Sequence, residues 1–348
     1  MTRAAIAFSV TSLLPVPLIT MGAMAGGAWA WIALGYLTLF TFAMDELVAL
    51  AAVEDATDRE FPAADLLSVT LAVAHFALLA LVIAAFGRGM AVGEGIALFL
   101  ATGLFFGQVS NSNAHELIHR SRRTLHNLGK WVYISLLFGH HTSAHPQVHH
   151  RFVASDKDPN SARLGESYYR FAARAWSGSF RKGLAVETAR RGGRVGLGHP
   201  YVTYFAGAGL MAVLAYGIGG GPGLVTFVGL AAYAQSQLLI SDYVQHYGLR
   251  RRTLPDGKLE PVGAQHSWDS RHVFSSHLML NAPRHSDHHA HPTRHFPDLT
   301  LPAPETAPTL PHSLPAMSML ALFPPIWRRV MDPRVALWTS AEPVVSAA

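Results

Sequence analysis

Long, nearly uncharged apolar runs constrain the fold of this chain more than any other feature of its sequence. A helix that spans a bilayer needs about 20 consecutive, mostly apolar residues, and several runs meet that requirement. They cover residues 4–24, 28–53, 63–86, 91–113, 200–218 and 223–245. Asp, Glu, Lys and Arg make up only 14% of the 348 residues, against about a quarter in soluble domains. The sequence therefore predicts an all-α integral membrane protein, one integral domain over 1–348 with six transmembrane helices.

Histidine and cysteine usage narrows the chemistry. The chain has 20 histidines and no cysteine. Without cysteine there can be no disulfide, no thiolate catalysis, no Cys-ligated zinc and no built-in iron–sulfur or rubredoxin-type centre. The histidines cluster, which favours a metal site. The net charge of +5 fits basic residues beside membrane segments better than a nucleic-acid surface, so we expect lipid and not nucleic acid around this protein.

Three histidine clusters have the spacing that places side chains on one face of a helix. They occur in the stretches "NAHELIHR", "HHTSAHPQVHH" and "RHSDHHAHP", and a lone histidine follows the last apolar run in "DYVQHYGLRR". The candidate ligands in these four stretches are His115, His119, His145, His149, His150, His246, His285, His288 and His289. Taken singly, each group could also be a set of surface or structural histidines.

The number of histidines bears on the metal. The first cluster contains His-Glu-x-x-His, the signature of a zinc protease, in which Glu116 would be the general base. One zinc takes four ligands, whereas nine imidazoles fit two metals with four or five ligands each. A ligating imidazole usually donates its other ring N–H to an acceptor. The acidic residues expected to accept such bonds are Asp45, Glu116, Asp158, Asp242, Asp269 and Asp287.

The four histidine groups must lie on one side of the membrane if they build one site. That is possible if the short apolar run 131–139 packs without crossing the bilayer. The basic stretches "HRSRRTLHNLGK", "RRGGR" and "LRRR" lie on the same side as the histidines, and Lys and Arg favour the cytoplasmic side. We therefore expect an inner-membrane protein with both termini and a histidine-rich catalytic cap, residues 114–199 and 246–348, in the cytoplasm.

The histidine motifs resemble those of the membrane alkane monooxygenases. The matching stretches, in chain order, are "NSNAHELIHR", "AHPQVHH", "SDYVQHYGLRR", "HSWDSRH" and "RHSDHHAHPTR". Together they extend from about residue 110 to residue 296. The same motifs relate the chain to the xylene monooxygenase hydroxylase subunit and, more distantly, to the membrane fatty-acid desaturases.

The resemblance implies a non-haem diiron enzyme that inserts one atom of O2 into an unactivated C–H bond. It implies that the nine histidines named above bind the two iron ions, with His140 in a supporting position. It also implies an external electron donor, either a rubredoxin with its reductase or a ferredoxin-type reductase. No protein acid, base or nucleophile is required beyond the metal ligands.

Three positions depart from the alkane pattern and leave the substrate open, and one of them is Asp242, which replaces an Asn. Ala144 and Gln245 occupy positions where the alkane enzymes usually carry Glu, and both resemble the xylene branch. The flanks of the third cluster resemble the alkane branch over a longer stretch. We expect hydroxylation of the terminal methyl of medium-chain alkanes that enter from the bilayer. The alternatives are a methyl-aromatic monooxygenase, a desaturase and, more remotely, a zinc protease or a metal transporter. The residues expected to line the substrate channel are Leu39, Phe42, Phe105 and Phe106.

Overall fold

The structure is a computed structural model that describes residues 3–49 and 63–340. Within these residues the regular secondary structure is helical, and no β-strand forms beyond isolated bridges. The end of the predicted run 28–53 lies outside the described residues, and so do the two chain ends on which the prediction about the termini falls.

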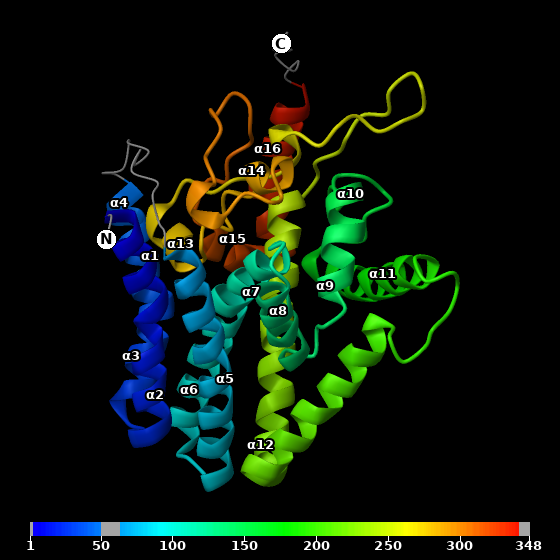
Figure 1. Cartoon of the computed structure of the whole chain (residues 1–348). Coiled ribbons are helices and arrows are strands. Elements are labelled where there is room, and N and C mark those ends of the chain that lie inside the picture. Colours follow the sequence, from blue (N-terminus) through cyan, green and yellow to red (C-terminus); the bar gives the residue numbers. More distant parts are fainter. Residues whose placement is uncertain (1–2, 50–62, 341–348) are drawn as a thin grey trace.

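Four long apolar helical segments lie side by side in the first third of the chain (Figure 1). They consist of α1 (Arg3–Leu13) with α2 (Pro15–Ala25); α3 (Ala28–Gly35) with η1 (Tyr36–Phe40) and α4 (Thr41–Ala49); α5 (Ala64–Arg88); and α6 (Val92–Leu104) with η2 (Phe105–Ser110) and α7 (Asn111–Ile118). Their starts agree with the predicted runs within a residue. The fourth segment continues to Ile118 instead of ending at residue 113, so this apolar helix itself carries the first clustered histidine.

The fifth long apolar segment is α12 (Pro200–His246), a helix of 47 residues. It breaks at Gly220, whose φ of 60° and ψ of −151° are accessible to glycine at little cost. Figure 1 shows the two halves of α12 meeting in a V at the end of the molecule farthest from α14. The predicted runs 200–218 and 223–245 correspond to these halves. Five described helices are thus long and apolar enough to span a membrane, and the predicted count of six treats the halves of α12 as separate crossings.

Glycine also sets how closely α12 approaches α5 beside this break. A Cβ atom added to Gly87 would lie 2.5 Å from the Cα of Gly219, closer than non-bonded carbon atoms approach. Only glycine therefore lets the two backbones touch here. This contact fixes the tip of the V against the end of α5.

A cap of shorter helices covers the opposite end of the long segments (Figure 1). These helices are α8 (Arg123–Ser135), α9 (His141–Ala144), η3 (His145–His149), α10 (His150–Phe152), α11 (Tyr168–Ala189), η4 (Ala264–His266), α13 (Val273–Leu278), α14 (His285–Ala290), η5 (Phe296–Asp298), α15 (Leu314–Ala321) and α16 (Pro324–Ser340). The apolar run 131–139 falls largely in α8, which has 13 residues. At 1.5 Å per residue α8 is about 20 Å long, which is shorter than the roughly 30 Å hydrocarbon core of a bilayer.

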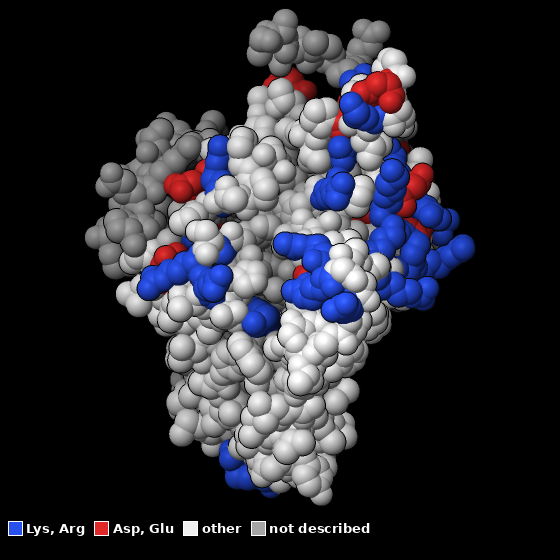
Figure 2. Space-filling model, turned by 45° about the vertical axis from the view of Figure 1, so that its right-hand side comes forward, with Lys and Arg blue, Asp and Glu red and all other residues white. Residues whose placement is uncertain are grey.

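The surface of the long segments is apolar where it faces outward. Large apolar side chains with more than half of their surface exposed occur on each of them, including Leu39, Val73, Val92, Val213 and Val225. Figure 2 shows Lys and Arg gathered on the upper half of the molecule, while the lower half of this face is almost uncharged. An apolar outer surface of this kind fits a multi-pass membrane protein.

The position of α8 predicts a specific labelling pattern. If α8 packs without crossing, a probe before the run 131–139 and a probe after it must be accessible from the same side. Single cysteines at the exposed positions Asn127 and Arg163 should therefore both react with an impermeant maleimide applied from the cytoplasmic side of inverted vesicles. The chain has no cysteine of its own, so the unsubstituted protein is the blank. Labelling of the two positions from opposite sides would overturn this topology.

Candidate metal centre

Nine imidazoles converge beneath the cap, from the end of α7, the helix α9–η3–α10, the end of α12 and α14. They form two groups, and within each group the candidate ligand nitrogens lie within 4.8 Å of one another. The first group is His115, His119, His145, His150 and His288. The second group is His149, His246, His285 and His289. All nine histidines predicted from the sequence are thus brought together, five in one group and four in the other.

A π-turn divides the second histidine motif between the two groups. In an α-helix His145 and His149, four residues apart, would share one face. In the π-helical turn η3 it is instead His145 and His150, five residues apart, that meet, with their Nε2 atoms 2.8 Å apart. His149 then belongs to the other group. Pro146, in the first turn of η3, lacks a backbone N–H donor, which suits a segment that departs from the α-helical hydrogen-bond pattern.

Hydrogen bonding alone does not satisfy the ring nitrogens of the first group. Nε2 of His145 lies 2.7 Å from Nε2 of His115 and 2.8 Å from Nε2 of His150. Nε2 of His150 lies in turn 3.1 Å from Nε2 of His288. A neutral imidazole nitrogen offers either one proton or one lone pair, so a single Nε2 cannot serve two such neighbours well. Nε2 of His119 is buried without a partner among the described residues. A cation that receives these lone pairs satisfies them together, so the first group fits a metal ion.

The second group shows the same convergence. Nε2 of His285 lies 2.9 Å from Nε2 of His246 and 3.1 Å from Nε2 of His289. Nε2 of His149 is buried, and the described part of the chain offers it no hydrogen-bond partner. The ring of His149 lies 4.8 Å, centre to centre, from the rings of His246 and His289. The four nitrogens are therefore within reach of one shared ion, and this group also fits a metal.

Burial keeps most of the clustered imidazoles in the neutral form that binds metals. Burial, reinforced by neighbouring histidines, lowers the pKa well below its usual value at His145, His150, His285, His288 and His289. Burial also lowers the pKa of His119 to about 4. At His149 burial again acts to lower the pKa, but the negative charge and hydrogen bond of Asp158 and the charge of Asp242 outweigh it, so the pKa is raised.

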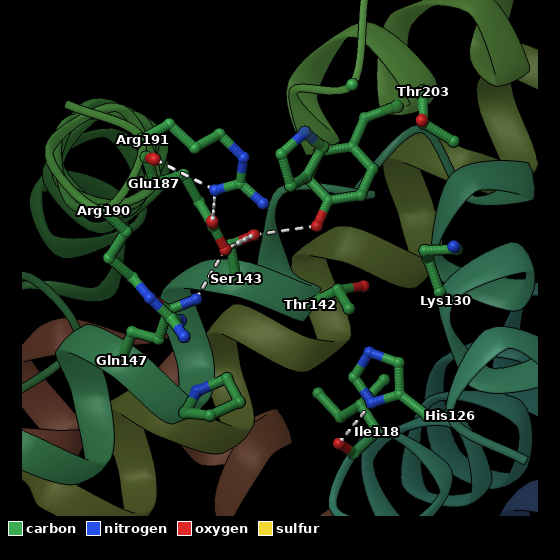
Figure 3. A pocket seen from close by; sticks show the side chains of 14 residues that line it. Ile118, His126, Lys130, Thr142, Ser143, Gln147, Glu187, Arg190, Arg191 and Thr203 are labelled. Carbon is green, nitrogen blue, oxygen red and sulfur yellow. Dashed lines mark hydrogen bonds and ion pairs between the residues drawn. The ribbon is translucent and has the colours of Figure 1, made fainter. Parts of the chain in front are cut away.

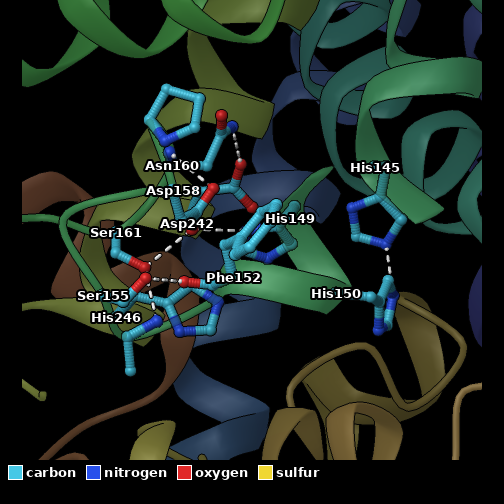
Figure 4. Close-up of polar contacts among 12 residues, drawn as sticks. His145, His149, His150, Phe152, Ser155, Asp158, Asn160, Ser161, Asp242 and His246 are labelled. Atoms are coloured by element: carbon cyan, nitrogen blue, oxygen red, sulfur yellow. Dashed lines mark hydrogen bonds and ion pairs between the residues drawn. The ribbon is translucent and has the colours of Figure 1, made fainter. Parts of the chain in front are cut away.

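Asp158 orients the ring of His149 (Figure 4). Its Oδ2 atom accepts a hydrogen bond from Nδ1 of His149 at 2.8 Å and another from the Ser161 hydroxyl at 2.7 Å. The backbone N–H of Asn160 donates to Oδ1 of Asp158, and the Asn160 amide donates to Asp242 at 2.7 Å. With Nδ1 held in this way, Nε2 of His149 is directed at the second group. Asp242 therefore supports the site through Asn160 and its charge.

Glu116 and Asp287 lie near the histidines but serve other partners, which differs from the sequence prediction. Glu116 forms an ion pair with Arg120 at 2.9 Å and accepts a hydrogen bond from the backbone N–H of Phe296. Both carboxylate oxygens of Asp287 accept from the guanidinium of Arg294. A buried carboxylate is most stable beside a cation, and each has an arginine within seven residues. Glu116 and Asp287 are close in sequence to candidate ligands, but neither accepts a hydrogen bond from the ring of one of them.

Asp45, Asp269 and His140 also differ from the prediction because each contributes to the scaffold around the site. Asp45 accepts a hydrogen bond at 2.8 Å from the backbone N–H of Ser275, 230 residues later in the chain. Asp269 accepts from the backbone N–H and the hydroxyl of Ser286 in α14, and burial raises the pKa of Asp269 to about 6. His140 lies 3.3 Å from a serine hydroxyl of α11. These contacts hold α13, α14 and α9 in place.

An apolar cavity of about 550 Å³ lies between the long helices and α15. Leu39 and Phe42, two of the residues predicted to line the substrate channel, line this cavity, and both side chains are largely exposed. Phe105 and Phe106, the other two, are fully buried and are not part of its wall. The ring of Phe106 packs 4.3 Å from that of His75 in the interior. Apolar side chains of a membrane protein face lipid, cavity or core alike, so residue type alone could not place these two.

A narrow pocket of about 50 Å³ adjoins this cavity and reaches the histidines. His115 and His285, one from each group, form part of its wall. The cavity and the pocket share the residues Gly107, Ser241 and Met279. The apolar cavity is therefore next to the pocket that reaches the histidines. We call this pocket the passage, and small or flexible side chains form the wall that it shares with the cavity.

Sequence reasoning missed the residues of this passage. Ser241 lies inside the apolar run 223–245, where a polar residue is a signal of function. His141, to which no role could be assigned from sequence, also lines the small pocket, and its ring lies 4.9 Å from that of His145. Met279 lies just beyond α13, and nothing in its sequence context distinguishes it.

The comparisons with known proteins agree with this geometry. A family model described as fatty acid desaturase matches residues 92–321. The chain is 34% identical over 299 residues to alkane 1-monooxygenase 1 of Alcanivorax borkumensis, covering 82% of this chain and 70% of that protein. It is 34% identical over 282 residues to the alkane 1-monooxygenase of Pseudomonas putida, covering 77% and 67%.

A more distant similarity is to the xylene/toluene monooxygenase hydroxylase component of Pseudomonas putida. That match is 27% identical over 240 residues and covers 65% of this chain and 60% of the relative. The family model spans the described site from α6 to α15 and therefore includes all nine clustered histidines. The chain thus belongs to the alkane 1-monooxygenases, a family of oxidoreductases within the wider fatty acid desaturase family.

Proposed function

We propose that this protein is a diiron alkane hydroxylase of the inner membrane, with its catalytic cap on the cytoplasmic side. The observation that carries the proposal is the convergence of nine imidazoles into one group of five and one group of four. Bound there, two iron ions would supply the O2-dependent oxidation of a C–H bond. The reaction consumes alkane, O2, two electrons and two protons, and yields a primary alcohol and water.

The side chains around the centre would bind, orient and shield the substrate. Leu39 and Phe42 expose 77% and 51% of their surface beside the apolar cavity, so a hydrocarbon dissolved in the bilayer could enter there. A cavity of about 550 Å³ is within the usual size range of small-molecule sites. Ser241 and Met279 then form the passage that would admit a chain end to the histidines. The buried setting excludes water from the reacting bond.

A direct test combines metal analysis with product analysis. Protein purified with iron, supplied with a rubredoxin, its reductase and a panel of apolar substrates, should contain about two irons per chain and form terminal alcohols. A single tightly bound zinc in active protein, without O2 consumption, would refute the proposal. An alkene product would identify a desaturase, which uses the same kind of histidine motifs.

A methyl-aromatic substrate is the second candidate, and two positions favour it. Ala144 and Gln245 stand where the alkane pattern has Glu, and a xylene/toluene monooxygenase component is among the relatives. Gln245 is buried beside the small pocket, accepting from Ser241 at 2.9 Å and donating to the carbonyl of Ala282 at 3.0 Å. The neutral amide of Gln245 is thus fully hydrogen-bonded to protein groups. The width of the passage would then determine whether a linear alkane or an aromatic ring reaches the histidines.

We expect octane to be preferred to para-xylene. The passage of about 50 Å³ should admit a linear chain end and hinder an aromatic ring. A difference of one methylene in such a site is worth roughly 10- to 200-fold in specificity, so the preference should reach at least about tenfold. A competition assay with both substrates and quantified alcohols measures it. A clear preference for para-xylene would change the substrate assignment and leave the diiron assignment standing.

The electron donor should bind in a salt-dependent manner. We expect a rubredoxin, a small acidic protein, to approach the basic side of the cap, where Arg122, Arg123 and Arg151 are exposed and Arg250 is half-buried. Figure 2 shows Lys and Arg concentrated over this half of the molecule. Turnover at limiting donor should fall by about tenfold or more between about 0.01 M and 1 M salt, where the Debye length shrinks from about 30 Å to 3 Å.

Charge reversal locates the docking surface of the donor. Arg151→Glu should slow turnover at limiting donor and low salt, whereas Arg88→Glu, at the other end of the long helices, should not. Turnover that is indifferent to salt and to Arg151→Glu would place the docking surface elsewhere.

A further inference from the structure

A second large cavity shares no lining residue with the apolar one and plays no part in the proposed reaction. It has a volume of about 680 Å³. Its wall includes Ile118, where one long apolar segment ends, and Pro200, where another begins. Residues of α8, α9, η3 and α11 complete it. The cavity is therefore placed at the level where membrane-spanning helices meet the polar cap.

Two cations line this cavity without an acidic partner. Lys130 donates to the amide oxygen of Asn127 at 2.9 Å, and Arg190 donates to the amide oxygen of Gln147 at 2.9 Å. Neither has a carboxylate within ion-pair distance among the residues that the structure describes. Figure 3 shows Lys130 and Arg190 on opposite sides of the cavity. Each keeps N–H donors available to a ligand between them.

The negative charge of Glu187, the one carboxylate in the wall, is already balanced by an arginine. It accepts hydrogen bonds from Ser143 at 2.8 Å and from Gln147, and it pairs with the guanidinium of Arg191. Burial acts to raise the pKa of Glu187, but these hydrogen bonds and the arginine charge lower it, so the carboxylate stays ionised and engaged. The cavity therefore presents a net positive charge from Lys130 and Arg190.

A buried hydroxyl at the same site lacks a partner. The side chain of Thr142 is 5% exposed, lines the cavity, and its Oγ1 atom has no hydrogen-bond partner in the described structure. Figure 3 shows it between Lys130 and Arg190. Buried hydroxyls are almost always hydrogen-bonded, so this one points to a ligand with an acceptor oxygen. An acceptor flanked by two cations is characteristic of a phosphate.

We propose that this cavity binds the phosphate ester headgroup of an anionic phospholipid. Lys130 and Arg190 would pair with the phosphate, and the Thr142 hydroxyl would donate to one of its oxygens. Basic pockets between the ends of transmembrane helices are suited to such headgroups. A lipid is favoured over free phosphate because exposed apolar side chains adjoin the cavity wall in the sequence: Leu197 precedes Gly198 and is 92% exposed, and Phe205 follows Tyr204 and is 64% exposed. Acyl chains could lie along that face.

A headgroup in this cavity would bear directly on the helix that carries the central histidines. Ser143 and Gln147 in the cavity wall alternate with His145 and His149 along α9 and η3. Glu187 bonds both Ser143 and Gln147, which ties this helix to α11. A lipid phosphate paired with Arg190 would add a further link between this helix and the end of α11. Anionic lipid would then stabilise the arrangement of the two histidine groups.

The test measures lipid binding rather than activity. The full chain is purified, exchanged into nanodiscs of phosphatidylcholine with or without phosphatidylglycerol, and its bound lipid is counted by native mass spectrometry after release. Wild type should retain phosphatidylglycerol selectively. The double variant Lys130→Gln with Arg190→Gln should lose roughly fivefold in affinity per cation, about 25-fold in all. Arg181→Gln removes an exposed charge outside the cavity, from α11, the helix that ends directly before Arg190, and should behave as wild type.

Three further observations separate the outcomes. Thr142→Val keeps the shape of the side chain but removes its hydroxyl, so it should weaken retention of phosphatidylglycerol without disturbing the fold. It therefore tests the site even if the double variant folds poorly. Thermal unfolding of each variant shows whether that variant is folded. Inorganic phosphate added to phosphatidylcholine discs should raise the midpoint of thermal unfolding far less than phosphatidylglycerol does. Equal retention of both lipids, equal retention by the double variant, or stabilisation by inorganic phosphate alone would each overturn the proposal.

Discussion

Replacing His288 by alanine should empty the five-histidine site and abolish alkane oxidation. His288 is buried, and its Nε2 lies 3.1 Å from that of His150, so its loss removes one ligand and leaves a cavity beside the others. His149→Ala should act in the same way on the four-histidine site. In each variant, activity should fall by more than the roughly 10- to 100-fold that loss of an outer hydrogen-bond partner costs. Iron content should fall from about two to one or fewer per chain.

His291→Ala is the matched control for these variants. His291 follows α14 directly, is largely exposed, and bonds Asp287 instead of facing either group. It should retain iron and activity. Circular dichroism and a monodisperse profile in detergent check that the long helices remain folded in all three variants. Full iron content and activity in His288→Ala would remove this residue from the metal site.

Ser241→Phe should block oxidation while leaving the metal in place. Ser241 belongs to the wall of both the apolar cavity and the small pocket, so an aromatic ring there would fill the passage of about 50 Å³. The activity towards medium-chain alkanes should fall by at least the roughly 10- to 200-fold that a mismatch of one methylene costs. Iron content should be unchanged, because Ser241 is not among the clustered imidazoles. Iron analysis and product yield on the same preparation provide the measurement.

Ser241→Ala separates the effect of filling the passage from the loss of the hydroxyl. The hydroxyl of Ser241 donates to Gln245 at 2.9 Å, so alanine removes that bond without adding volume, and activity should largely persist. Overpacking costs typically 1–3 kcal/mol, and the shift in unfolding temperature shows whether Ser241→Phe still folds. Undiminished oxidation by the phenylalanine variant would mean that the substrate reaches the histidines by another route.

The clustering of the histidines could be predicted from sequence, but their division between two sites could not. Spacings of three and four residues place rings on one face of any helix, which suffices to expect a shared metal centre. The grouping depends on η3, where His145 meets His150 and His149 turns away. A π-turn is a local departure from α-helical hydrogen bonding that no periodicity in this stretch reveals. Sequence spacing therefore indicated which histidines come together, but not how they divide between the two groups.

The surroundings of the site were harder to predict because they depend on contacts between distant segments. Asp158 holds His149 from nine residues away, and such a local pair is within reach of sequence reasoning. Asp45 instead bonds a backbone N–H 230 residues later, which only the tertiary fold determines. Phe105 and Phe106 were assigned to the channel because they are large and apolar, yet η2 turns them into the core. In a membrane protein, hydrophobicity does not separate core from cavity.

The π-turn η3 also has an evolutionary consequence. Such a turn is equivalent to an α-helix with one extra residue inserted. Deleting Val148 would therefore convert the turn into an α-helix in which His145 and His150 stand four residues apart, the spacing that keeps two rings on one face. The same two rings would still meet, without any change of a histidine. In a relative that lacks one residue at this point, the alignment gap would mark the loss of the turn and not a change in which histidines share a group.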